Sequence, residues 1–389
     1  MRRTLWFVLL ASVTAAARAQ QAQTGLGWSA LPALNYNSDE GFGYGLTGGL
    51  YQYGDGNHTP YVWAFEPLVF FTTHGRRKVS VFYDAPHQFG DGVRLTARAY
   101  VDRDCCQPYY GLGNATTYLD TLAARTSLPN YYSYTRTRVS LDGFLQWRLV
   151  PRARVLTGVA LNRNTTAARD PDTQFARDLA NGTIPAGEEG STSLGPKLGL
   201  IYDTRDSERD PRQGVWIEGL VWQGVVLPGG DDFTRWTGTL RGYLSLHRSL
   251  TLAARVFGEH VPGSGPIAIL TDLGSSFQDF TGVGGAESVR GVLRLRFLGR
   301  TRTLGNLEAR WRGPGFRFLG APWQLGAVGF VDAGRVWDDR GAGDGGAGLH
   351  WGKGGGLRVA WGQSFIIAAD FGHGQEAGLQ TYLKLGHMF

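Results

Sequence analysis

Apolar and polar residues alternate with a period of two along most of the chain, in segments of about ten residues. In GVRLTARAYV, which ends at Val101, valine, leucine and alanine alternate with arginine, threonine and tyrosine. Because successive side chains of a β-strand point to opposite faces, each segment predicts a strand with one apolar and one polar face. A soluble β-sandwich alternates as well. The many long segments and the arginines on their polar faces favour outer-membrane strands, whose apolar faces meet lipid.

Sixteen segments of this kind are predicted. They lie near residues 25–36, 41–53, 60–72, 77–86, 91–101, 134–149, 152–163, 194–203, 214–226, 234–247, 250–259, 303–312, 323–332, 353–361, 364–371 and 379–389. The longest connections (102–133, 164–193, 260–302 and 333–352) all follow odd-numbered segments, and the tightest turns follow even-numbered ones. Outer-membrane barrels have an even number of strands, with short turns at one end and long loops at the other. The sequence therefore predicts an all-β fold, a transmembrane antiparallel β-barrel of about sixteen strands.

The N-terminal residues predict export. Arg2 and Arg3 precede an apolar run that begins at Leu5, and Ala17-Arg18-Ala19 is a small-x-small cleavage site. This is the layout of a secretory signal peptide and is too short for a membrane span, although an N-terminal anchor helix is the alternative. We therefore expect a signal peptide at 1–19, cleaved near Ala19, and an outer-membrane barrel at 20–389.

The composition limits which partners and cross-links the protein is expected to have. Loss of the leader removes three arginines and lowers the formal net charge from +6 to +3, so the basic balance is weak evidence for a nucleic-acid partner. We expect none. The two cysteines, Cys105 and Cys106, are adjacent in a polar stretch, which excludes a disulfide framework. They are either two thiols or a strained vicinal disulfide.

Candidate chemistry is sparse. Ser245 and His247 lie two apart on one strand face, but no acidic residue completes a triad convincingly. The histidines are scattered without metal-ligand spacing. Asp338, Asp339 and Asp344 belong either to a calcium loop or to a flexible solvated loop. We expect no enzyme activity, no catalytic residues, no metal site and no cofactor.

Five motifs support a family resemblance. In chain order they are DTRDSERDPRQG, GGAESVRG, GNLEARW, GFVDAGRVW and GKGGGLRVAW. In this order and at these strand positions they resemble the BamA/TamA-like superfamily of outer-membrane assembly and translocation barrels, also described as bacterial surface antigen barrels. LPALNYNSDEGFGYG and YYGLGNAT are similar to strands of that family too. The resemblance covers essentially the whole mature chain.

The resemblance implies an internal ion-pair site. In the family a long loop folds into the lumen and its tip arginine meets carboxylates of the wall. The matching tip is Val289-Arg290-Gly291, and the matching carboxylates are Glu308 and Asp332. An unpaired charge in a narrow lumen costs several kcal/mol, which is why a guanidinium there needs carboxylates. The alternative is a solvated outer loop with scattered arginines. Alternation puts Asn306, Glu308 and Arg310 on the polar face of one strand, whereas Asp332 shares its face with apolar Val328 and Phe330.

The resemblance assigns a turn motif, and the final strand predicts an assembly signal. The turn motif comprises Asp203, Arg205, Asp206, Pro211 and Gly214. The last strand ends at Phe389, an aromatic terminus of the kind that the barrel assembly machinery recognises during biogenesis. Arg294 and Arg296 are interpreted as lumen-facing or loop-contact residues.

Two features depart from the family pattern. Val292 stands where family members usually carry Phe or Tyr after the tip glycine. The periplasmic POTRA domains that assembly and translocation members carry are not expected here, because the first strand begins a few residues after the cleavage site.

Two functions remain open. The barrel either assists the insertion or translocation of a protein or lipid client at the outer membrane, or is a passive pore or structural surface barrel that has lost client handling. In both cases its partners include outer-membrane lipids.

Overall fold

The computed structural model describes residues 24–124, 130–184, 190–263, 265–318, 321–338, 348–361 and 365–389. The predicted signal peptide at 1–19 lies outside the described residues. The long strands are β1 (Leu26–Asn37), β2 (Gly41–Gln52), β3 (Trp63–Thr72), β4 (Arg77–Ala85), β5 (Val93–Pro108), β6 (Ser133–Val150), β7 (Ala153–Ala168), β8 (Gly190–Asp203), β9 (Gly214–Leu227), β10 (Phe233–His247), β11 (Leu250–His260), β14 (Thr301–Phe318), β15 (Ala321–Trp337), β16 (His350–Trp361), β17 (Phe365–Gly374) and β18 (Gln380–Leu385).

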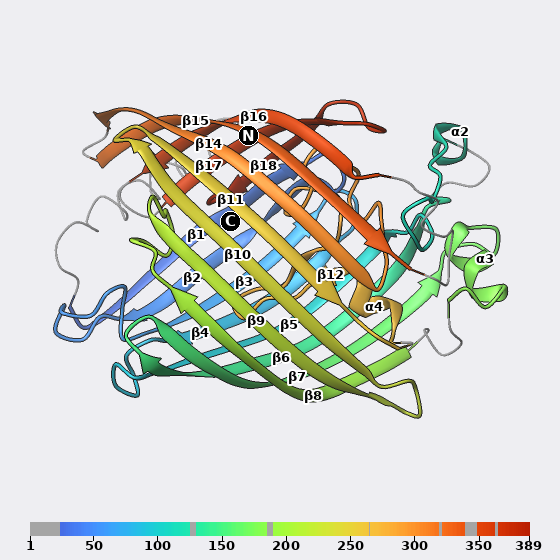
Figure 1. Ribbon diagram of the computed structural model, residues 1–389, viewed down its shortest axis with the longest axis horizontal. Coiled ribbons are helices and arrows are strands. Elements are labelled where there is room, and N and C mark those ends of the chain that lie inside the picture. Colours follow the sequence, from blue (N-terminus) through green and yellow to red (C-terminus); the bar gives the residue numbers. More distant parts are fainter. Residues whose placement is uncertain are drawn as a thin grey trace.

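These sixteen strands form one closed antiparallel barrel, as the alternation predicts (Figure 1). Each pairs with its neighbours in the chain, except that β11 pairs with β14 and β1 closes the ring against β18. The shorter elements lie in the connections. They are α2 (Asp120–Ala123), α3 (Gln174–Ala180), α4 (Ile267–Leu270), β12 (Asp272–Leu273) and β13 (Phe280–Thr281).

The barrel wall has the opposite polarity to a soluble protein, with apolar side chains exposed and polar side chains buried. On β10, Trp236, Leu240 and Leu244 point outward and are about half exposed, whereas Arg235 and Thr237 point inward and are buried. The same arrangement of apolar side chains outside and buried polar side chains inside recurs on the other long strands. This is the polarity of a barrel that meets hydrocarbon on its outer surface.

The predicted end of the last strand was wrong. The apolar alternation predicts a last strand over 379–389, but β18 ends at Leu385. Gly386 has a φ of 80°, a left-handed conformation that glycine adopts without strain, and the chain leaves the strand there. Phe389 consequently lies in the interior, where it packs against Tyr243 and Ala253.

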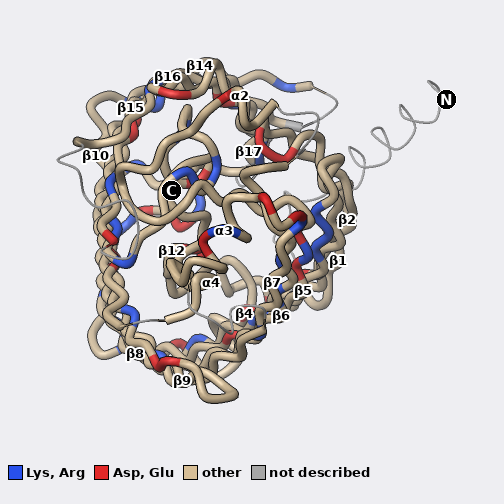
Figure 2. Tube along the Cα trace, turned by 90° about the vertical axis from the view of Figure 1, so that its right-hand side faces the viewer, with Lys and Arg blue, Asp and Glu red and all other residues tan. Residues whose placement is uncertain are grey.

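The long connection between β11 and β14 contains many buried polar side chains. We call residues 261–300, described apart from position 264, the inner segment. Its Ser276 contacts Glu218 on β9, and its Arg294 contacts Asp104 on β5. β12 and α4 lie inside the outline of the wall when the tube is viewed from the side that shows the ring (Figure 2). Contacts to distant parts of the ring mean that the inner segment crosses the barrel interior.

Candidate functional site

The apolar part of the inner segment packs beneath two connecting loops. Ile267, Leu270, Leu295 and Leu298 are almost completely buried. They belong to one cluster with side chains from the segments after β5 and β7 and the strands between them, namely Tyr109, Leu112, Tyr134, Phe175 and Ile184. Burial of these side chains holds the inner segment in the ring and fixes where its polar tip lies.

The tip arginine meets a set of carboxylates. The side chain of Arg290 is fully buried, and its Nε lies 2.7 Å from Asp332 Oδ2. Its Nη1 lies 2.7 Å from Glu308 Oε1 and 3.1 Å from Asp370 Oδ2. Nη2 donates a second bond to Asp332 Oδ1 at 3.1 Å, so Asp332 is held in a fork. Burial opposes the charge of Arg290, but Asp332 and Glu308 outweigh burial and raise its pKa above the ordinary value.

The structure therefore brings together Arg290, Glu308 and Asp332, the three residues that the resemblance pairs. Their role stays a proposal. Asp370 on β17 is a third partner that sequence reasoning missed. It faces inward on a predicted strand, and that alternation was the available signal. Nothing in the sequence shows that its strand lies near β15 in the ring, with β16 between them.

The backbone beside Arg290 passes very close to the wall. Gly291 has a φ of 89°, and a Cβ added there would lie 2.6 Å from the carbonyl carbon of His373. Its N–H donates to the hydroxyl of Tyr382 on β18 at 3.0 Å. The guanidinium lies 3.5 Å from the ring centroid of Phe330, so the apolar neighbours of Asp332 pack against the tip. Only a glycine fits this approach.

The valines flanking the tip are also buried. Val289 is fully buried and Val292 nearly so, and both pack with Val283, Phe297 and Val336. Val292 occupies the place of the family aromatic in this small apolar cluster. The departure from the family pattern is therefore accommodated by packing against other side chains of the inner segment and β15.

Arg294 and Arg296 contact carboxylates in different parts of the barrel. Arg294 pairs with Glu40 in the turn between β1 and β2, and its Nη2 lies 2.5 Å from Asp104 Oδ2. Arg296 Nε lies 2.5 Å from Glu376 Oε2. These carboxylates were not predicted, because each lies at least 80 residues away in sequence. Burial alone raises the pKa of Glu40, but Arg294 and Arg76 lower it to about 2.

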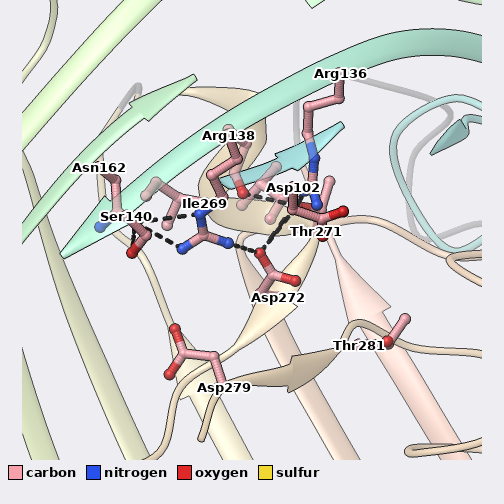
Figure 3. A network of polar contacts seen from close by, with 12 residues as sticks. Asp102, Arg136, Arg138, Ser140, Asn162, Ile269, Thr271, Asp272, Asp279 and Thr281 are labelled. Atoms are coloured by element: carbon pink, nitrogen blue, oxygen red, sulfur yellow. Dashed lines mark hydrogen bonds and ion pairs between the residues drawn. The ribbon is translucent and has the colours of Figure 1, made fainter. Parts of the chain in front are cut away.

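A second polar network anchors the middle of the inner segment (Figure 3). Arg138 of β6 pairs with Asp272, and its Nη2 donates to Asn162 Oδ1 at 2.9 Å. Arg136 donates to the hydroxyl of Thr271 at 2.6 Å. Two neighbouring arginines of the wall thus bind the inner segment where β12 begins.

The predicted turn motif forms a hydrogen-bonded turn. Arg205 Nε lies 2.9 Å from Asp203 Oδ1, while Asp206 accepts from the N–H groups of two residues across the turn. Pro211 is buried, and Gly214 has a φ of 101° with Thr204 O 2.3 Å from an added Cβ. The motif fixes the connection between β8 and β9.

The C-terminus is held beside this turn. Arg310 Nη2 donates to the carbonyl oxygen of Phe389 at 2.8 Å, and Arg310 also pairs with Glu308. His387 Nε2 lies 3.1 Å from Asp210 Oδ1 in the turn between β8 and β9. The residues after β18 are thus linked to Arg290 through the shared carboxylate of Glu308.

The junction of β1 and β18, which we call the seam, is incompletely paired. β1 pairs with β2 along its whole length, but with β18 it pairs at Tyr36↔Leu383 and Asn37↔Tyr382 alone. Both strands are fully described. Among the described residues no strand pairs with this side of Leu26–Asn35, and such an edge is a template for pairing with another strand.

Other candidate sites remain unassembled in the described residues. Ser245 donates to the carbonyl of Arg212, and His247 Nδ1 contacts Ser249 rather than Ser245. Cys105 and Cys106 are thiols whose sulfur atoms lie 2.8 Å apart. Three or more potential metal-ligating His, Cys, Asp or Glu side chains do not cluster anywhere in the described chain. Asp339 and Asp344 lie outside it. Among the helices that are described, none has the length and apolar character to cross a membrane.

Residues 71–375 match the model of the Omp85 superfamily domain. The chain belongs to the Omp85 superfamily. The predicted BamA/TamA-like resemblance is confirmed by this match and by the barrel structures below. No curated protein matches the sequence.

Solved Omp85 barrels share the fold. BamA from Haemophilus ducreyi lacking POTRA domains 1–3 is 14% identical with a TM-score of 0.59, and the match covers 94% of this chain and 70% of that one. CdiB from Acinetobacter baumannii is 16% identical with a TM-score of 0.55, covering 93% and 60%. CdiB from Escherichia coli is 12% identical with a TM-score of 0.59, covering 93% and 62%. The chain thus spans between 60% and 70% of the length of these structures. Its barrel is a transmembrane barrel of the outer-membrane type.

Proposed function

We propose that this Omp85 barrel helps to insert or move protein or lipid clients at the outer membrane, with the inner segment as a lumen plug and the seam as a gate. The observation that carries the proposal is the short pairing of β1 with β18. Every other neighbouring pair of long strands runs over at least six register positions. A break at the seam disrupts the fewest backbone hydrogen bonds.

The lumen contacts support the same proposal. Arg290 binds β14, β15 and β17, on the side of the barrel that leads to β18, and the neighbouring Gly291 bonds Tyr382 of β18 itself. Arg294 binds the turn that joins β1 to β2. The inner segment therefore contacts both sides of the seam, so a change in its position alters the two strands that would separate.

We also propose export through the secretory pathway, with cleavage near Ala19 and residues 20–389 forming the mature outer-membrane barrel. The described strands begin at Leu26, a few residues after that position. N-terminal sequencing of the protein from outer membranes would begin at Gln20. A sequence that begins at Met1 would contradict cleavage. We propose no catalytic role and no cofactor for this chain.

Gene deletion with complementation tests the function. The strain lacking the gene is complemented with the wild type, with a Cys105→Ser/Cys106→Ser background, or with Tyr36→Cys/Leu383→Cys in that background, which can cross-link the seam. We expect the deletion to alter outer-membrane protein or lipid composition, the background to restore it, and the cross-linked seam to restore it only after reduction. Unchanged composition together with steady single-channel conductance of the purified protein would instead favour a passive pore or structural barrel.

A further inference from the structure

A polar cavity lies between the inner segment and the wall beside the seam. Its volume is about 440 Å³, within the usual range of small-molecule sites of about 300–1,000 Å³. Strands β1, β3, β4, β5, β6 and β18 form one side, and residues of the inner segment form the other. The network in Figure 3 borders it, because Arg136, Arg138, Asp272 and Asp279 are among its lining residues. We call this space the seam cavity.

The seam cavity opens toward the bilayer between β1 and β18. Its lining includes Asn35 and Lys384 from the inner face of the two strands. It also includes Leu34 and Leu385, which point outward and are 48% and 51% exposed. A cavity bordered by both faces of both strands passes between them. The opening begins where the pairing at Tyr36↔Leu383 stops.

The carboxylates that line the seam cavity already have donors. Arg76 bonds Asp102 and Glu40, Arg138 pairs with Asp272, Lys197 lies 2.8 Å from Asp142, Thr281 donates to Glu287, Ser275 donates to Asp279, and the N–H of Arg294 donates to Asp39. Their negative charges are therefore neutralised or hydrogen-bonded within the protein.

Two cations of the lining, Lys78 and Arg98, are not matched in this way, and a third, Lys384, has only a long ion pair. Within the described part of the chain, neither Lys78 nor Arg98 has a carboxylate in ion-pairing distance. Lys78 lies 5.3 Å from the ring centroid of Tyr100, and Arg98 donates to the carbonyl of Phe277. Lys384 is 3.9 Å from Asp370, beyond hydrogen-bond distance, and donates to the carbonyl of Ala286. The lining as a whole has seven basic and seven acidic side chains, but Lys78 and Arg98 are cationic donors that no described carboxylate pairs, and they remain available to an anion.

We propose that the seam cavity binds the phosphate of a glycerophospholipid that enters from the bilayer, with Lys78, Arg98 and Lys384 as its ligands. The phosphodiester would lie against the three cations, and the acyl chains would pass between Leu34 and Leu385 into the hydrocarbon. Charge-assisted bonds to phosphate oxygens are the strong class of hydrogen bond. The proposal rests on the proposed function in using the seam as an opening, and it names lipid as the client class.

Lipid fits better than a client peptide strand. A strand added to the free edge of β1 would extend the wall by backbone hydrogen bonds, and its pairing would not need side chains of β4 and β5. Lys78 and Arg98 lie on those strands, well inside the opening. An anionic head joined to apolar chains matches both the inner cations and the outer leucines.

The test measures lipid bound to the full-length mature barrel in detergent by native mass spectrometry. The probes are dioleoylphosphatidylglycerol, glycerol phosphate as the free headgroup, and dioleoylglycerol, which lacks phosphate. The variants are Lys78→Gln/Arg98→Gln and the charge-conserving Lys78→Arg. The matched control is Lys353→Gln/Arg163→Gln, which removes one lysine and one arginine from exposed positions outside the cavity. The heat-induced gel shift checks that each variant folds.

We expect the wild type, Lys78→Arg and the control to bind dioleoylphosphatidylglycerol, and Lys78→Gln/Arg98→Gln to lose about tenfold in affinity. That variant should fold, because removing cations without carboxylate partners leaves no carboxylate unpaired. Equal binding of dioleoylglycerol, equal binding of glycerol phosphate, or equal loss in the control would each overturn the site. Lipid binding with the expected variant pattern, but unchanged membrane composition on gene deletion, would reject the proposed function and leave the site standing. Altered membrane composition on gene deletion without lipid binding to the purified barrel would reject the site and leave the proposed function standing.

Discussion

The two ends of the barrel sheet, where β1 meets β18, differ sharply from the junction of β14 and β15 further round the ring. β14 pairs with β15 from Thr301↔Trp337 to Phe318↔Ala321, whereas the seam pairs at Tyr36↔Leu383 and its neighbour. Both are antiparallel junctions of the same ring. The barrel is therefore closed at the seam, but the seam has far fewer paired residues than the β14–β15 junction.

The inner segment follows the same division. Against β14 and β15 its Arg290 is fully buried and meets Glu308 and Asp332 at 2.7 Å. Beside the seam, Lys78 and Arg98 line an open cavity without carboxylate partners in the described residues. One side of the lumen is therefore a closed ion-pair network, and the other retains space and unmatched charge. Our proposals assign stability to the first side and the capacity to bind or open to the second.

The largest effect is expected from breaking the closed side. Arg290→Ala would leave Asp332 and Glu308 buried without this guanidinium, and removing one partner of a buried ion pair costs about 3–5 kcal/mol. We expect the barrel to lose its heat-induced gel shift at a lower temperature. Arg163→Ala, which removes an exposed arginine on β7, is the matched control. An unaltered shift in Arg290→Ala would show that the network does not stabilise the barrel.

Locking the seam should abolish the contrast between the two junctions. A disulfide in Tyr36→Cys/Leu383→Cys, in the Cys105→Ser/Cys106→Ser background, should stabilise the barrel by about 2–4 kcal/mol and protect β1 amides from hydrogen exchange.

The matched lock for the β14–β15 junction is Leu307→Cys/Val331→Cys, which joins two outward side chains that lie directly opposite each other on these strands. This second lock should leave exchange in β1 unchanged, because that junction is already fully paired. Equal protection of β1 by both locks would show that the seam opens no more readily than the rest of the wall.

Two adjacent carboxylates tie the paired end of the seam to the inner segment and should respond oppositely to pH. Burial raises the pKa of Asp39 to about 6, whereas Arg294 and Arg76 overcome burial and lower that of Glu40 to about 2. Ionisation of Asp39 therefore lowers stability as pH rises from about 4 to 6. Protonation of Glu40 lowers stability as pH falls below about 4.5.

Asp39→Asn should consequently stabilise the barrel at pH 7, by no more than about 3 kcal/mol, and be neutral near pH 4. Glu40→Gln should destabilise it at pH 7, with the difference vanishing as pH approaches 2. Thermal unfolding followed by gel shift across this pH range measures both. The same pH dependence in the two variants would contradict the opposite assignments.

The sequence predicts the barrel well because alternation is local. A period of two is visible within any one strand, and the sorting of long and short connections gives the strand count without knowledge of contacts. The tip arginine and two of its carboxylates were reached through family motifs, while Asp370 was missed. Its partner lies 80 residues away, and only closure of the ring brings them together.

The seam shows the other limit. The alternation that predicts a strand to Phe389 is real, but a single glycine redirects the chain. Gly386 adopts its left-handed φ because the last residues find partners inside, with Arg310 bonding Phe389 and Asp210 contacting His387. A glycine near the end of a strand pattern signals a bend. Which way the chain bends depends on side chains from distant strands, which no local pattern contains.

The smallest effect is expected at Pro32, on the free edge of β1. The N–H of Ser38 donates to Thr381 across the seam, and alternate residues of a strand point their N–H groups the same way, so the nitrogen of Pro32 faces the seam. Proline there has no hydrogen to donate, which blunts the edge. Continuing the register of β1 and β18 would place His387 opposite it.

Pro32→Ala restores one donor, and we expect it to stabilise the paired form of the seam by about 1 kcal/mol, since one net hydrogen bond is worth about 0.5–1.5 kcal/mol. Hydrogen exchange of β1 amides should slow slightly. The control Pro67→Ala, in β3 and away from the seam, should leave β1 unchanged. If Pro32→Ala did not alter β1 exchange, the open seam would be maintained by the inward path of residues 386–389 rather than by the missing donor. Arg310 binds both Phe389 and Glu308, and Glu308 also pairs with Arg290. This ion-pair network would then be what keeps the seam unpaired.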